Sequence, residues 1–456
     1  MSSEVPLFIR GAVDTTPPAT KRSKLLRVFG GGRPFAALLQ SMSTQVLVIG
    51  INILTGVLTA RALGPDGRGA FAAITTWPQL LATLATAGLN SAVIFRMRKA
   101  PEQVGSIASA SLIVSTATSL VAIGIGVLLM PMWMARYSPW IITFSQLCLA
   151  TVLLNSWQMV IKQGFSGSGR FGRFNLSQLL PQLLYLLALL GLIAFAAMRV
   201  ESAVLALLGG GAIALCVTLV LFVREVRPRL QGAFCELKAV VSYSTRAMLM
   251  DAVFSLGTYI DRIVLIPLLA GRELGLYAVA YSFSRVIQLS QPAITSVVFS
   301  HMAKVDELQS RVLHDRALRM LLIGLVIGCT CLWAIGAPLL RLAYGGEFAA
   351  ANTVFRLLVI EASLGALSQV TAQLYLSHDR PGVVSIIQVS VLGATLGALL
   401  LLVPVYGATG AAIALLAGGT LRWLCLLGGV SLVLRQRLPG LLLTRTDLHY
   451  LIGRIR

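Results

Sequence analysis

The sequence predicts an all-α polytopic membrane protein, with twelve transmembrane helices in two six-helix bundles related by a parallel repeat. Three observations lead to this fold class. The chain of 456 residues is 57% hydrophobic and only 12% charged, with a mean hydropathy of +0.84, whereas about 25% of residues are charged in soluble domains. Apolar stretches long enough to cross about 30 Å of hydrocarbon recur along the whole chain. A short turn motif occurs once in each half.

The apolar stretches define the predicted spans, and every connection between them is short. In chain order the spans are 36–62, 70–95, 104–130, 140–161, 175–198, 202–223, 244–269, 274–300, 317–340, 350–376, 382–403 and 408–434. The segment "TTPPATKRSKLLRVFGGGR" before them is basic and rich in Pro and Gly, a composition typical of disorder. The predicted organisation is a disordered basic cytoplasmic tail (1–34), an N-terminal six-helix bundle (35–224), a cytoplasmic linker (225–242), a C-terminal six-helix bundle (243–435) and a cytoplasmic tail (436–456).

The net charge of +20 follows the predicted topology. With both termini in the cytoplasm, 26 of the 37 Lys and Arg residues lie on the cytoplasmic side, six lie on the opposite side and five lie inside helices. This is the positive-inside pattern, so the charge predicts contact with anionic membrane lipids and no nucleic-acid partner. The six cysteines have no pairing or ligand spacing, and we predict no disulfide, no metal site and no cofactor.

The repeated turn divides the chain into halves. A shift of 206 residues aligns "LTARALGPDGRGAFAAI" with "LIPLLAGRELGLYAVA", so that Gly69 matches Gly275 and Phe71 matches Tyr277. The motif lies between the first and second spans of each half. Because each half has an even number of spans, the repeat is parallel, and two bundles that rock against each other are expected.

Ionisable residues inside the predicted membrane region are all in the second half. An ionisable side chain there costs about 2.5–3.5 kcal/mol on insertion scales, so each one needs a partner, a wet cavity or a function. These residues are Arg246, Asp251, Asp261, Arg262, Arg285, Arg356, Glu361 and Arg422. Arginines outnumber acids, so an anionic ligand would balance the charge. Two alternatives remain for the acids Asp251, Asp261 and Glu361: ion pairs that hold helices together, or sites of ion coupling.

Polar side chains recur at helical spacing on three spans. In span 274–300, Tyr277, Tyr281, Arg285 and Gln288 share one face, and Asp251 and Arg262 share one face of the preceding span. The first span presents uncharged groups, which include Asn52 and Thr55. One bundle therefore offers neutral hydrogen-bonding groups, and the other offers guanidinium groups.

The sequence resembles the polysaccharide transporters of the multidrug/oligosaccharidyl-lipid/polysaccharide (MOP) exporter superfamily. The resemblance covers roughly residues 36–434 and depends on "ARALGPDGRGAFAAI", on "YIDRIVLIPLLAGRELGLYAVAYSFSRV" at 259–286, and on the twelve-helix layout. It implies a flippase of alternating access, not an enzyme, that moves a polyprenyl-pyrophosphate-linked oligosaccharide (an exopolysaccharide, capsule or O-antigen repeat unit) across the bacterial cytoplasmic membrane. It also implies polysaccharide polymerase and export proteins as partners.

For such a substrate the two sets of side chains have distinct expected roles. Arginine binds phosphate in a bidentate manner, so we expect diphosphate at Arg262, Arg285, Arg422 and Arg356. We expect the sugar at Asn52, Thr55, Tyr277, Tyr281 and Gln288, because amides and hydroxyls pair with sugar hydroxyls and Tyr stacks on sugar faces.

The sequence disfavours three other classes of membrane protein. Peptidoglycan-precursor flippases of the superfamily usually have fourteen helices. Drug exporters of the same fold often carry a carboxylate in the first helix, and none lies between Arg33 and Arg61. A membrane-embedded sugar polymerase or glycosyltransferase needs catalytic groups on a sizeable loop, and the predicted outer loops are short. The sequence leaves the glycan and the coupling ion undetermined.

Overall fold

The computed structural model describes residues 32–269, 271–288, 307–378, 380–437 and 439–440. This part of the chain is almost entirely helical and contains no β-strand. The predicted all-α fold class is therefore confirmed. Nearly all of both predicted tails lies outside the described residues, as does the end of the predicted span 274–300. Residues 32–34, predicted to be disordered, already belong to the first helix.

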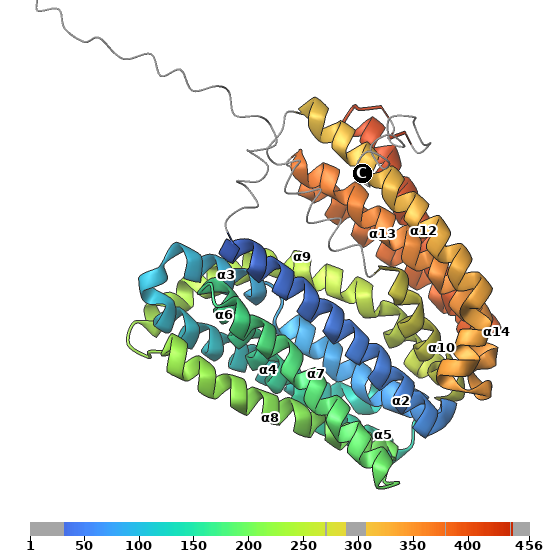
Figure 1. Cartoon of the computed structure of the whole chain (residues 1–456), viewed down its shortest axis with the longest axis horizontal. Coiled ribbons are helices and arrows are strands. Elements are labelled where there is room, and N and C mark those ends of the chain that lie inside the picture. Colours follow the sequence, from blue (N-terminus) through green and yellow to red (C-terminus); the bar gives the residue numbers. More distant parts are fainter. Residues whose placement is uncertain (1–31, 270, 289–306, 379, 438, 441–456) are drawn as a thin grey trace, which may run out of the picture.

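The described part of the first half consists of seven α-helices and one 3₁₀ turn (Figure 1). They are α2 (Gly32–Ala85), α3 (Leu89–Lys99), η1 (Pro101–Gln103), α4 (Val104–Trp133), α5 (Pro139–Cys148), α6 (Ala150–Gly167), α7 (Phe171–Ala194) and α8 (Val200–Val226). Buried Ala, Ile and Leu side chains of α2 pack on the apolar faces of α4, α6 and α7. This packing forms one bundle.

The described part of the second half contains five α-helices and two 3₁₀ turns. They are α9 (Ala233–Leu268), α10 (Gly271–Ser284), η2 (Arg285–Gln288), α12 (Glu307–Tyr344), η3 (Gly346–Ala351), α13 (Asn352–Ser377) and α14 (Pro381–Leu432). Helix α13 is the most buried, because α12 and α14 cover two of its sides. Only 227–232 is non-helical between α8 and α9, so much of the predicted linker 225–242 belongs to helices.

Eight helical segments among the described residues are long and apolar enough to cross a membrane. Two of them, Ser43–Lys99 with 57 residues and Gly382–Leu432 with 51, are long enough to cross twice. Helix α9 carries several charges and is not among these eight segments. Part of the next predicted span, 274–300, lies outside the described residues. The count of twelve spans thus stays a prediction.

Both long segments turn back at a glycine with positive φ. Gly64 has φ 67° and ψ 179°, and Gly407 has φ 57° and ψ −137°, angles that only glycine adopts without strain. A Cβ at Gly418 would lie 2.1 Å from Oγ1 of Thr395, so residues almost equidistant from Gly407 face each other. Each of these helices is therefore an antiparallel pair of arms.

The two halves meet most extensively where the repeated turns lie, which we call the hinge end. Helices α2 and α10 share the largest contact between the halves, and α12 to α14 stand apart from α4 to α8 (Figure 1). Arg61 contributes to this junction by donating from Nε to the carbonyl of Ala343, at 2.7 Å, and from Nη2 to Leu342. The positive guanidinium group also stabilises the partial negative charge at the C-terminus of α12, whose last carbonyls it binds.

Helix α9 contacts both halves of the chain, because it packs on α2, α3 and α4 as well as on α14 (Figure 1). Its N-terminal part is held to α3 by an ion pair between Glu236 and Arg96 and by stacking of Tyr243 on Phe95, with ring centroids 4.8 Å apart. The second half is thus linked to the first through one long helix in addition to the hinge end.

Candidate functional site

The centre of the second half contains a buried carboxylate. Asp261, on α9, is 2% exposed, and its Oδ2 accepts a hydrogen bond of 2.5 Å from the hydroxyl of Tyr277 on α10. The two residues come from successive helices, α9 and α10. This bond satisfies one carboxylate oxygen of Asp261 inside the protein, as a buried charge requires.

Two guanidinium groups lie over one aromatic ring next to Asp261. The Cζ atom of Arg262 is 4.3 Å from the ring centroid of Tyr281, and that of Arg285 is 4.2 Å from the same centroid. Each cation–π contact contributes up to about 2 kcal/mol when it is desolvated. Tyr281 therefore holds two like charges near each other, which is the geometry expected of a site that binds an anion.

Glu361 joins this group from α13, and its Oε2 lies 2.8 Å from Nη2 of Arg285. Gln288, on η2, donates from Nε2 to the carbonyl of Ala362 at 2.7 Å. Gly365 gives room for two polar groups, since a Cβ there would lie 3.0 Å from Nε2 of Gln288 and 3.4 Å from Nη2 of Arg422. The side chain of Arg422, on α14, thus reaches the same region.

We call these residues the cationic cluster: Asp261, Arg262, Tyr277, Tyr281, Arg285, Gln288, Glu361 and Arg422. Three guanidinium groups meet two carboxylates in it. The Nε atoms of Arg285 and Arg422 are buried and have no hydrogen-bond partner among the described residues. The cluster therefore has donors and positive charge that the described residues do not use. Helical spacing predicts one shared face only for Tyr277, Tyr281, Arg285 and Gln288. The structure brings the whole cluster together from five elements: α9, α10, η2, α13 and α14.

A second polar site lies in the first bundle, in a cavity of about 390 Å³ between α2, α6, α7 and α8. Both arms of α2 line it: Asn52 and Thr55 from the first arm, and Gln79 from the second. The structure thus puts the two predicted sugar-binding residues of this half in one cavity. It also puts Arg68 there, a residue that the topology had assigned to an outer turn. The missed signal was the spacing of Arg68, which comes three residues before Phe71 and seven before Thr75 and so shares one helix face with them.

Two predicted site residues, Asp251 and Arg356, belong neither to the cationic cluster nor to the cavity of the first bundle. Asp251 accepts a hydrogen bond of 2.9 Å from the backbone N–H of Gly88, which is the N-cap of α3. Arg356 lies over the ring of Trp333, with Cζ 5.6 Å from the centroid. Asp251 therefore acts at a helix N-terminus, where a negative charge is stabilising, and Arg356 packs against α12.

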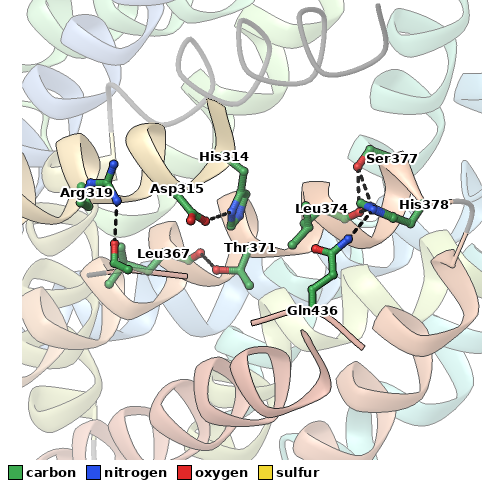
Figure 2. A network of polar contacts seen from close by, with 10 residues as sticks. His314, Asp315, Arg319, Leu367, Thr371, Leu374, Ser377, His378 and Gln436 are labelled. Atoms are coloured by element: carbon green, nitrogen blue, oxygen red, sulfur yellow. Dashed lines mark hydrogen bonds and ion pairs between the residues drawn. The ribbon is translucent and has the colours of Figure 1, made fainter. Parts of the chain in front are cut away.

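Another polar network lies at the ends of α12 and α13 (Figure 2). His314 is fully buried and contacts Asp315, with Nδ1 3.5 Å from Oδ1. His378 hydrogen-bonds to the carbonyl of Leu374 at 2.8 Å through Nδ1, and its Nε2 lies 2.9 Å from Nε2 of Gln436 (Figure 2). The network joins the C-terminal end of α13 to the segment after α14, and none of the predicted site residues belongs to it.

An apolar groove of about 720 Å³ runs between α2, α4 and α9. The stacked rings of Trp77 and Trp133, with centroids 3.9 Å apart, lie at this groove. Ile260 and Ile263 of α9 also line it, and they flank Asp261 and Arg262 of the cationic cluster in sequence. Apolar surface and positive charge are therefore adjacent on one helix.

Two helical bundles that meet at one end, built from helices apolar enough to cross a membrane, define a multi-pass membrane protein. Solved structures share this fold. The lipid II flippase MurJ, in an inward closed conformation, matches with a TM-score of 0.72 at 13% identity, over 92% of this chain and 96% of that one. An inward-facing MATE multidrug resistance transporter of the MOP superfamily matches with a TM-score of 0.64 at 14% identity, over 84% and 96%. An outward-facing MATE transporter matches with a TM-score of 0.60 at 17% identity, over 85% and 92%.

The family is identified by sequence. The model of the polysaccharide biosynthesis protein family matches residues 38–305, more than half of the chain, and the chain belongs to this family. No curated protein matches it in sequence. The predicted resemblance to the MOP superfamily is confirmed. The matched proteins are transporters and flippases, in agreement with the prediction that the chain is not an enzyme.

Proposed function

We propose that the protein is a flippase that moves a polyprenyl-pyrophosphate-linked oligosaccharide from the inner to the outer leaflet of the bacterial cytoplasmic membrane. The observation that carries the proposal is the pair of guanidinium groups of Arg262 and Arg285 over Tyr281, 4.3 and 4.2 Å from its centroid. A diphosphate carries negative charge on several oxygens and matches two arginine forks. Arg422 is the third cation available to it.

The other parts of the substrate have matching surfaces. The cavity of the first bundle offers amides and hydroxyls for the glycan, and the apolar groove beside Ile260 and Ile263 has room for a prenyl chain. Membership in the polysaccharide biosynthesis family supports a glycan as the cargo. The two halves contact each other mainly at the hinge end, as expected for a transporter that opens to alternate sides of the membrane. We place the hinge end on the outer side of the membrane and both termini in the cytoplasm.

Export of small molecules is the second candidate, because multidrug transporters share the fold. An exporter of cationic drugs needs acidic groups in excess. The cationic cluster instead has more arginines than acids, and no Asp or Glu is among the residues that line the first-bundle cavity.

Deletion of the protein tests the proposal. A flippase deletion strain should accumulate lipid-linked oligosaccharide on the cytoplasmic leaflet, and the wild-type gene should clear it. Arg285→Ala and Arg422→Ala should fail to clear it while reaching the membrane in normal amount, and Arg285→Lys should clear it partly, since lysine keeps the charge but lacks the fork. Arg341→Ala is the matched control in the same half, because Arg341 is exposed on the last turn of α12. Loss of surface polysaccharide without accumulation would contradict the proposal, and so would efflux of cationic dyes that depends on Arg285.

A further inference from the structure

A groove of about 620 Å³ lies within the second half, between α9, α13 and α14. Its walls combine apolar side chains with three side-chain amides, those of Gln369, Gln373 and Gln388. We call it the glutamine groove. Arg422, a member of the cationic cluster, also lines it. A ligand in this groove therefore lies next to the residues that we propose for the diphosphate.

A polar stripe on α13 leads from the cationic cluster into the glutamine groove. Its members follow each other at intervals of four residues, which places neighbours in the series on the same side of the helix: Glu361, Gly365, Gln369 and Gln373. Glu361 belongs to the cluster, and a Cβ at Gly365 would lie 3.4 Å from Nη2 of Arg422. The groove thus continues the cluster along α13.

Gln388, on α14, reaches the same level from the opposite wall. A Cβ at Gly257 of α9 would lie only 2.9 Å from its Nε2, so this amide passes close to the backbone of α9. Gly257 comes about 6 Å before Asp261 of the cationic cluster along the helix axis, a distance that one sugar unit spans. Arg246, the other cation of the groove, comes about 16 Å before Gly257 on the same helix, too far to contact the same sugar.

The amides of the groove have hydrogen-bonding capacity to spare. Those of Gln369 and Gln388 have no partner within the described part of the chain, and Gln373 makes one long bond of 3.5 Å from Nε2 to the backbone carbonyl of Gln369. A primary amide is both donor and acceptor. Such groups are unfavourable among apolar side chains in a membrane unless water or a ligand satisfies them. The groove therefore suits a ligand that offers a donor and an acceptor together.

We infer that the glutamine groove binds the sugar joined directly to the diphosphate and selects a sugar with an acetamido group at C2. The inference rests on the proposed function and concerns which glycans the protein accepts. An acetamido group has one N–H donor and one carbonyl acceptor, which pair reciprocally with a glutamine amide. Its methyl group matches apolar side chains of the wall, such as Ala372, Ile387 and Leu426. A hydroxyl at C2 lacks that methyl group and leaves part of the amide unpaired, which is unfavourable.

Binding to the purified full-length protein tests the inference. The two probes are farnesyl-diphosphate-linked N-acetylglucosamine and farnesyl-diphosphate-linked glucose, which differ only at C2 of the sugar. We expect the wild-type protein to bind the acetamido probe about tenfold more tightly, because that probe makes hydrogen bonds that glucose does not make. The preference is a ratio of two affinities from one preparation, so partial unfolding of a variant does not change it.

Two kinds of variant locate the preference. Gln388→Leu and Gln369→Leu remove one amide each and should reduce it to about threefold or less. Gly257→Ala keeps both glutamines but places a Cβ 2.9 Å from Nε2 of Gln388, so it should displace that amide and weaken the preference in the same way. The matched control is Gln146→Leu, because the amide of Gln146 bonds to the carbonyl of Val127 in the first half and should not affect the preference.

The outcomes separate the two proposals. Equal affinity of the wild-type protein for both probes, or a full preference in the double variant Gln369→Leu with Gln388→Leu, would overturn the inference and leave the proposed function standing. Arg285→Gln should weaken the binding of both probes alike, because both carry the diphosphate. If Arg285→Gln bound them as tightly as the wild type, or if neither probe bound the wild type, the proposed function would fail and the inference with it.

Discussion

Gly69 and Gly275, which the internal repeat aligns with each other, are in backbone contact across the two halves of the protein. A Cβ at Gly275 would lie 3.0 Å from the nitrogen of Gly69 and 1.9 Å from the carbonyl oxygen of Pro65. A Cβ at Gly69 would lie 1.7 Å from the carbonyl oxygen of Gly271. The equivalent turns of the repeat thus pack against each other, and only glycine permits that distance.

The first prediction follows from this contact. Gly275→Ala should push α10 away from α2 and lower the free energy of unfolding by about 1–3 kcal/mol, as overpacking of a close contact does. Thermal unfolding of the purified protein measures the effect. The matched control is Gly397→Ala on α14, where a Cβ would meet no atom within 4 Å. Equal stability of the two variants would show that the backbone contact is not needed.

A second prediction concerns motion at the hinge end. Asp66 and Arg272 lie on the contacting turns, and a Cβ at Gly271 would be 3.9 Å from the carbonyl oxygen of Asp66. In a chain whose six native cysteines are replaced, Asp66→Cys with Arg272→Cys should form a disulfide that blocks transport, and a reducing agent should restore it. The halves must separate here to release a ligand outward. Normal transport with the disulfide fully formed would contradict a mechanism in which the two halves rock against each other.

The third prediction separates two roles of Asp251. Its Oδ2 accepts from the N–H of Gly88 at 2.9 Å, so Asp251→Ala should leave a helix N-terminus uncapped and cost about 1 kcal/mol of stability. Asp251→Asn keeps an acceptor oxygen and should retain most of both stability and transport. The measurement is thermal unfolding together with transport. If Asn abolished transport in a stable protein, Asp251 would instead be a site of ion coupling.

The ion pair of Arg285 and Glu361 gives a fourth prediction. Because Glu361 lies 2.8 Å from Arg285, we expect Glu361→Gln to reduce transport by loosening that guanidinium group, without changing how transport depends on pH. The measurement compares transport by the wild type and the variant over about two pH units, from about pH 6 to about pH 8. A coupling role for Glu361 predicts the opposite result, since the variant would then lose the pH dependence of the wild type.

The fifth prediction concerns topology. The bias of Lys and Arg predicts that both termini lie in the cytoplasm. A reporter that is active only in the periplasm should therefore be silent when it is fused after Arg437, and the same reporter inserted after Arg136 should be active. Activity at Arg437 would contradict an even number of spans.

The sequence by itself determined the fold class, because hydropathy and turn residues act locally. A long run of apolar residues forms a helix in hydrocarbon whatever its neighbours are, because its backbone groups must be hydrogen-bonded within the segment. Gly64, between two such runs, predicts a turn from local sequence alone. Helical periodicity also places Tyr281 and Arg285 on one face of a helix. That information was enough to predict the membrane fold, the repeat and most members of the cationic cluster.

The tertiary structure alone decided which polar groups meet. Asp251 bonds to Gly88 and not to an arginine, and Arg356 packs on Trp333 away from the cluster. Arg68, which topology had assigned to an outer turn, lines a cavity because α2 folds back at Gly64 and packs against α7. Partners such as these are more than twenty residues apart in sequence, and their meeting depends on the angle at which whole helices pack, which no local pattern encodes.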